Sequence, residues 1–121
     1  MGNNSKLAIN SLLMFNKLDS NAKIVLNKKE NAEKRKKSNT VIFDTYRLIL
    51  SPFFDITKDK KYVGDLKNAI AKRESEVTVL ISSNGDVKEI ENIIRPVLDH
   101  LKKTVKTCKL NHDELKEVIH F

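Results

Sequence analysis

Residues 86–108 read DVKEIENIIRPVLDHLKKTVKTC, and this stretch decides the fold. Its apolar residues recur every third or fourth position, which is the period of an α-helix, and Asp86 with Glu89 has the spacing of an N-terminal capping box. Pro96 is expected to bend or split the helix, because proline has no backbone N–H to donate to the carbonyl of Asn92. The stretch predicts the main core helix, with an apolar stripe made of Val87, Ile90, Ile94, Val97, Leu101, Val105 and Cys108.

Helical signals also lie on both sides of this core helix. On its C-terminal side, Asn111 with Glu114 repeats the capping pattern and predicts a short final helix. On its N-terminal side, the apolar spacing predicts one helix over residues 62–73 and another over residues 40–50. The β-branched start of the second segment, TVIF at residues 40–43, leaves a strand as an alternative there. Pro52 should end the second of these, because the residue before a proline disfavours helical geometry.

The first forty residues predict two more helices. Apolar positions at helical spacing occupy residues 7–18. The sequence LDSN, residues 18–21, should then break the helix. A second helix, capped by Ser20, is expected to follow. Its apolar residues stop at Leu26, so residues 27–39 are expected to form an exposed basic arm or loop.

The segment that precedes the core helix carries a different pattern. Val77, Val79 and Ile81 alternate with other residues, and an Asn-Gly pair follows, which is typical of a β-strand that leads into a turn. Such a strand needs a partner for its backbone groups. The sequence therefore predicts a mainly α protein, a small bundle of about five helices with a minor β element near residues 77–82. An α+β fold is the alternative.

The length and the cysteine content limit the class of protein. A chain of 121 residues can bury a core without disulfide or metal support, so one domain over residues 1–121 is expected. Cys108 has no second cysteine to pair with, and the N-terminus lacks the residue order of a signal peptide. The apolar runs are far shorter than the roughly 20 residues that span a bilayer. These features predict an intracellular, cytoplasmic protein without a transmembrane segment.

Positive charge is concentrated near the N-terminus. The net charge is +7, and residues 1–40 contain nine Lys or Arg and three acids, so they supply +6 of it. A local excess of positive charge attracts polyanions. Arginine is the usual choice for bidentate contacts, and most of these cations are lysines, so contacts with a phosphate backbone are favoured over base reading. The candidate binding residues are Lys23, Lys28, Lys29, Lys34, Arg35, Lys36 and Lys37.

Two hypotheses of different classes explain this surface. The first is a small non-enzymatic protein that contacts nucleic acid through the lysines of residues 23–37. The alternative is a helical protein-interaction module, which would be an adaptor, an inhibitor or a self-associating regulator. Its partner would present an acidic surface or be a second copy of the chain, because an exposed helix half and an unpaired strand both leave contact surface free.

A minor hypothesis concerns catalysis. Arg95 and His100 in RPVLDH have the R-x-x-x-x-H spacing, which resembles the motif of HEPN-type ribonucleases. The resemblance implies a helical bundle in which this arginine and histidine act on the scissile phosphate of RNA. Glu117 and His120 have a spacing used in di-iron bundles, but no second Glu-x-x-His is present, so no metal and no cofactor are expected. Cys108 continues the apolar stripe and is expected to be a buried, inert thiol.

Overall fold

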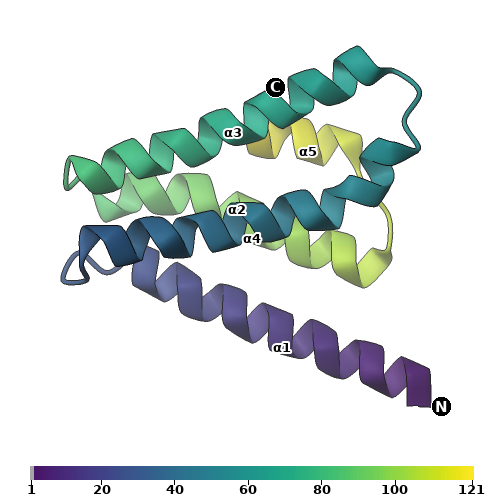
Figure 1. Cartoon of the computed structure of the whole chain (residues 1–121), viewed down its shortest axis with the longest axis horizontal. Helices are drawn as coiled ribbons and strands as arrows, with labels where there is room; N and C mark the ends of the chain where they lie inside the picture. The colour runs from purple at the N-terminus through teal and green to yellow at the C-terminus, as the bar shows by residue number, and fades with distance from the viewer. Residues whose placement is uncertain (1) are drawn as a thin grey trace.

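The computed structural model describes the backbone of residues 2–121 and the side chains of residues 11–121. Within these residues it contains five helices and no strand (Figure 1). The prediction of a mainly α bundle of about five helices is therefore confirmed. The helices are α1 (Gly2–Val25), α2 (Ala32–Asp55), α3 (Lys60–Ser82), α4 (Val87–Thr107) and α5 (His112–Ile119).

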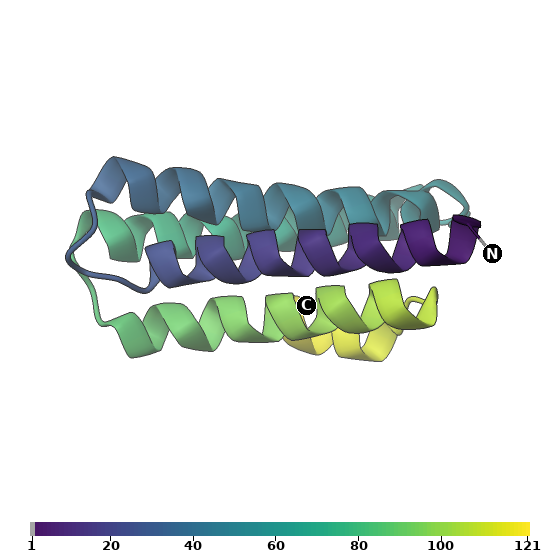
Figure 2. The same cartoon turned by 90° about the horizontal axis from the view of Figure 1, so that it is seen from below.

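The four long helices run alternately in opposite directions and are joined by short turns. Figures 1 and 2 show α2 between α1 and α3, with α4 along the remaining side. The short helix α5 turns back from the end of α4 and packs against α3 and α4. Among the described residues, no helix is both long and apolar enough to span a membrane.

Each helix contributes one apolar face to a shared core. The centre of the core consists of large side chains of α2, α3 and α4 that are fully shielded from solvent, and burial of such surface is the main favourable term in folding. The predicted stripe of α4 is buried at Ile90, Ile94, Val97 and Leu101. Its last member, Cys108, is exposed because it lies past the helix end, where it adopts a left-handed conformation as the C-cap. The prediction of a buried thiol is wrong.

The predicted strand at residues 77–82 is also wrong, because these residues are the last turns of α3. Val77 and Ile81 are buried, whereas Val79 is 61% exposed, as expected for positions four and two residues apart on a helix. The Asn-Gly pair ends the helix instead of forming a hairpin. Asn84 has a positive φ of 55°, and the N–H of Gly85 donates to the carbonyl of Leu80 at 2.6 Å.

The predicted break at LDSN does not occur, and α1 continues through it to Val25. The chain breaks at residues 26–31 instead, where two asparagine side chains bind the backbone. Asn27 Oδ1 accepts from the N–H of Lys29 at 3.0 Å, and Asn31 Oδ1 caps α2 by accepting from the N–H of Glu33 at 2.7 Å. Such local bonds compete with a continuous helix. The predicted apolar contribution of residues 7–10 lies outside the described side chains.

Both prolines lie inside helices. Pro52 was expected to end its helix, but α2 continues to Asp55. The proline lies near the end of α2, where one missing hydrogen bond is offset by the burial of Phe54. Pro96 lies inside α4, which neither ends nor divides there.

Candidate nucleic-acid interface

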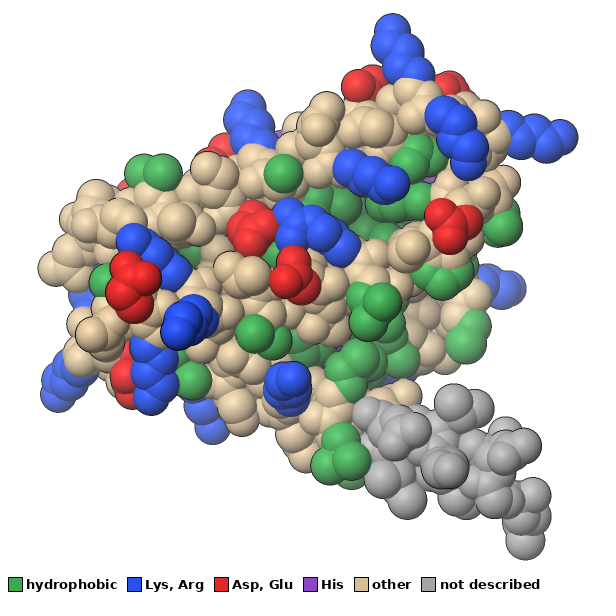
Figure 3. All heavy atoms as spheres, viewed as in Figure 1, with side chains coloured by type: hydrophobic (Ala, Val, Ile, Leu, Met, Phe, Trp, Pro, Cys, Tyr) green, Lys and Arg blue, Asp and Glu red, His purple; other side chains and the backbone are tan. Residues whose placement is uncertain are grey.

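Five exposed lysines surround the connection between α1 and α2. Lys23 lies in the last turn of α1, Lys28 and Lys29 lie in the connection, and Lys34 and Lys37 lie in the first turns of α2. We call these five residues the basic turn. Figure 3 shows lysine and arginine side chains, with a few acids among them, gathered over the end of the bundle where α2 begins.

Two acids neutralise part of this charge. Lys34 Nζ lies 3.4 Å from Glu30 Oε2, and the half-exposed Lys36 lies 3.5 Å from Glu33 Oε1. The partners of each pair are three or four residues apart and open to solvent. Each pair therefore contributes little to stability, and its lysine can exchange the carboxylate for a phosphate. The other lysines of the basic turn form no ion pair with a described side chain. Lys36 therefore belongs to the rim of the site.

Arg35 does not belong to the exposed surface, in contrast to the prediction from sequence. Its side chain is 2% exposed, and its Nε donates to the carbonyl of Val25 at 2.9 Å, which ties α2 to the end of α1. Burial lowers the pKa of Arg35 from its ordinary value. Ser38 and Asn39 are buried beside it. Of the predicted basic segment 27–39, residues 27–31 lie in the connection before α2, and residues 32–39 are the first turns of α2, which contact the bundle through Arg35, Ser38 and Asn39.

Arg95 and His100 do not lie on one surface. Two positions that are five residues apart on a helix differ by about 140° around its axis, so the side chains of Arg95 and His100 leave α4 in different directions. Arg95 lines a cleft between α1 and α4. His100 is 1% exposed and points into the bundle on the side of α5, where it lines a different pocket with Glu114. Within this chain, the pair is not placed to act on a single phosphate.

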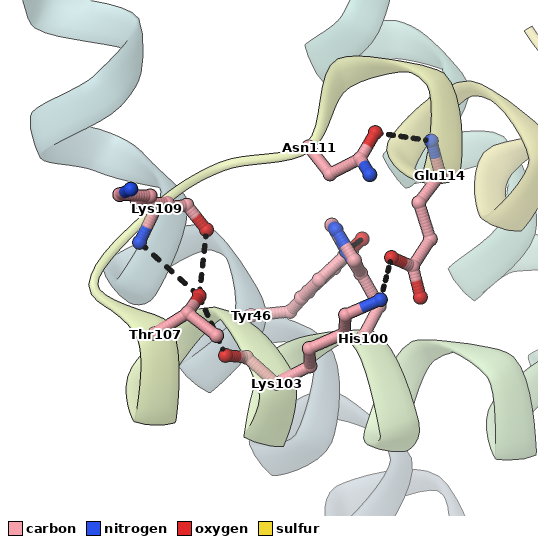
Figure 4. A network of polar contacts seen from close by, with 7 residues as sticks. All are labelled: Tyr46, His100, Lys103, Thr107, Lys109, Asn111 and Glu114. Carbon is pink, nitrogen blue, oxygen red and sulfur yellow. Dashed lines mark hydrogen bonds and ion pairs between the residues drawn. The ribbon is translucent and has the colours of Figure 1, made fainter.

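His100 belongs to a polar network that joins α2, α4 and α5 (Figure 4). Its Nδ1 lies 2.7 Å from Tyr46 Oη. Burial raises the pKa of Tyr46, so its phenol stays protonated, and which of the two atoms donates follows the tautomer of the imidazole. Figure 4 also shows Glu114 beside the histidine, with Lys103 Nζ 2.9 Å from its Oε2.

The charges of this network follow from its surroundings. Burial lowers the pKa of His100, although the nearby carboxylate of Glu114 opposes this shift. The hydrogen bond from Lys103 holds the pKa of Glu114 below its usual value. At neutral pH the site therefore contains a neutral imidazole and an ionised, paired carboxylate. These groups connect three helices of the bundle.

The predicted absence of a metal site concerned Glu117 and His120. Among the described side chains, no group of three or more His, Cys, Asp or Glu residues could hold a metal ion.

The structure also places at the candidate site Lys102, which the sequence did not single out, and Arg95, which the sequence singled out only as a catalytic candidate. Lys102 and Arg95 are seven positions apart on α4 and line the same cleft as Lys23 of α1. The seven-residue spacing is visible in the sequence, but the position of Lys23 at the same cleft depends on which helix packs against α4. Comparisons with protein-family models, with curated proteins and with solved structures found no match to this chain.

Proposed function

We propose that the protein is a non-enzymatic nucleic-acid-binding protein that contacts the phosphate backbone through the basic turn. The observation that carries the proposal is the clustering of five exposed lysines from two helices and their connection. Residues 23–37 contain seven cations and two acids, and after removal of the buried Arg35 the surface still has a net charge of +4. The intracellular, cytoplasmic location inferred from the sequence is part of this proposal.

The chemistry of the basic turn favours phosphate contacts without base reading. Lysine ammonium groups neutralise phosphates as point charges and release counterions when they bind. Bases are usually recognised by aromatic stacking or by planar hydrogen-bonding groups. Neither of the two tyrosines belongs to the basic turn, since Tyr46 is buried and Tyr62 packs near α5. We therefore expect weak dependence on sequence and strong dependence on salt.

The test is fluorescence anisotropy of labelled duplex DNA, single-stranded DNA and RNA, titrated with the protein. The variant K23Q/K28Q/K29Q/K34Q/K37Q removes the basic turn. A matched control, K58Q/K60Q/K61Q/K67Q/K72Q, removes five exposed charges from the connection between α2 and α3 and from α3 itself. Circular dichroism and urea titration check that both variants fold. The proposal requires that the first variant lose binding and that the control retain most of it; equal loss in both would reject a localised site.

The protein-interaction module is the second candidate function. Leu12 and Leu13 of α1 are each more than half exposed, and Val79 lines an apolar groove between α3 and α4 with Leu80 and Ile93. Exposed apolar surface of this kind favours contact with another protein. If the wild type binds no nucleic acid at low salt, analytical ultracentrifugation over a range of protein concentrations tests for self-association into a homo-oligomer.

The ribonuclease hypothesis has a separate test. If purified protein cleaves RNA, the ribonuclease hypothesis requires that Arg95→Ala and His100→Ala each abolish the cleavage. Because the structure places these residues on different sides of α4, we expect that neither substitution reveals a catalytic role.

A further inference from the structure

The four arginines of the chain differ in how free they are to contact a ligand. Arg35 is buried against the end of α1. Arg73 is also buried and pairs with Glu76, and Arg47 pairs with both Asp44 and Glu74. Arg95 is different, because its side chain is 49% exposed and its contact with Glu91 is long, at 3.8 Å. Among the side chains that the structure describes, Arg95 is the arginine most available for a bidentate contact.

Arg95 lies at a cleft that also contains cations from other parts of the sequence. The cleft has a volume of about 570 Å³ and lies between α1 and α4, which run side by side in opposite directions (Figure 2). One apolar residue of α1 and one that directly follows α1 line it, together with charged residues of both helices. The lining residues are Asp19, Ala22, Lys23, Leu26, Arg95 and Lys102.

The charge of this cleft is positive and continuous with the basic turn. Three cations and one acid give it a net charge of +2. The acid, Asp19, pairs with Lys102 at 2.6 Å, which leaves Lys23 and Arg95 as the cations with the weakest internal contacts. Lys23 is a member of the basic turn as well, so the two surfaces share a residue. Further along α4, Lys106 lies over the ring of Phe15 and extends the positive charge beside α1.

We infer that the α1–α4 cleft binds a phosphate of the same nucleic-acid strand that the basic turn contacts, with Arg95 and Lys102 as its additional ligands. This inference rests on the proposed function. A guanidinium presents a planar pair of N–H donors that matches two phosphate oxygens, and the cleft walls reduce the exposure of the contact to water. The distance along α4 from Arg95 to Lys102 is about 10 Å. The cleft can therefore add one or two phosphate contacts to those made by the basic turn.

The experiment uses salt titrations of oligonucleotide binding with variants of the cleft. Each neutralised phosphate contributes about 0.9 to the slope of log K against log salt on duplex DNA and about 0.7 on a single strand. The variant R95Q/K102Q should therefore lower the magnitude of the slope by at least the contribution of one phosphate, about 0.7 on a single strand or about 0.9 on duplex DNA. The charge-preserving variant R95K/K102R should keep the slope. The control K58Q/K61Q removes two exposed lysines elsewhere and should also keep it.

Asp19→Asn provides a test of opposite sign. It removes the one carboxylate that lines the cleft and releases Lys102, so oligonucleotide affinity should rise by roughly twofold or more, on the scale of an exposed ion pair. If R95Q/K102Q leaves the slope unchanged while the basic-turn variant still loses binding, the inference that the cleft binds phosphate is overturned and the proposed function is left intact. Absence of wild-type binding overturns both.

Discussion

Arg35 shows how neighbouring cations can have different roles. In the sequence it stands between Lys34 and Lys36 and looks equivalent to them. In the structure its guanidinium caps a carbonyl at the end of α1, while its neighbours face solvent or the rim of the site. A pattern of charges along a chain does not distinguish these roles, because burial depends on the residues that pack against each side of the helix.

Substitution of Arg35 should therefore affect stability rather than binding. Arg35→Ala should lower the free energy of unfolding by about 2–4 kcal/mol, since it removes a charge-assisted hydrogen bond to Val25 and the packing of the side-chain stem. Lys37→Ala should change it by less than about 0.5 kcal/mol. Urea titrations measure both values. Equal, small effects of the two substitutions would show that Arg35 is not part of the packed structure.

His100 predicts a pH dependence of stability. Burial lowers its folded-state pKa below the ordinary value of 6.5, so the unfolded chain binds the proton more readily than the folded protein does. The stability that the folded protein gains from keeping His100 neutral is fully present above pH 6.5 and is lost as the pH falls below that value. Glu114 stays ionised in this range because its own pKa is lowered by Lys103.

Urea titrations at about pH 7.5 and pH 5 test this prediction, because an ordinary histidine titrates between these values. The wild type should be less stable at the lower pH, and His100→Gln should show a smaller difference between the two conditions. His112 and His120 remain in both proteins and serve as the internal reference. An identical pH difference in the variant would contradict the assignment to His100.

At the scale of the element, the end of α3 shows why the pattern of residues 77–82 was ambiguous. Positions 77 and 81 lie on the same face in both a strand and a helix, and position 79 alone separates the two. The predicted strand required all three apolar residues to face one side. The structure buries Val77 and Ile81 and exposes Val79, so α3 extends to Ser82.

Two substitutions distinguish these alternatives in solution. Val77→Ala should lower the free energy of unfolding by about 1–3 kcal/mol, because it removes two buried methyl groups. Val79→Ala should change it by less than about 0.5 kcal/mol, because the side chain is largely exposed. Chemical denaturation of the two variants provides the comparison. Similar losses at both positions would favour the strand.

Helix starts were predictable where a capping side chain and a strong apolar stripe agree. Asp86 caps α4 and Asn111 caps α5, as their spacing to Glu89 and Glu114 indicates. The break between α1 and α2 was missed because Asn31 is followed by a lysine at the capping-box position instead of a glutamate. Local signals therefore identified the starts of α4 and α5, which carry complete capping patterns, and missed the start of α2, which is capped by Asn31 alone.

At the scale of the whole molecule, the bundle brings together charges that are far apart in the sequence. The sequence identified the lysines of the basic turn because they all lie within residues 23–37. It could not identify the cleft, since Lys23 and Lys102 line one cleft only because α1 packs against α4. The candidate site is therefore partly visible in the sequence, and its extension across α4 is a property of the fold.

The salt dependence of wild-type binding to nucleic acid tests the central claim most directly. If the five lysines of the basic turn each neutralise one phosphate, the slope of log K against log salt on duplex DNA should be at least about 4.5 in magnitude. Phosphate contacts at the cleft would increase it further. No measurable binding at about 50 mM salt, or an affinity that does not change with salt, would contradict the proposed function.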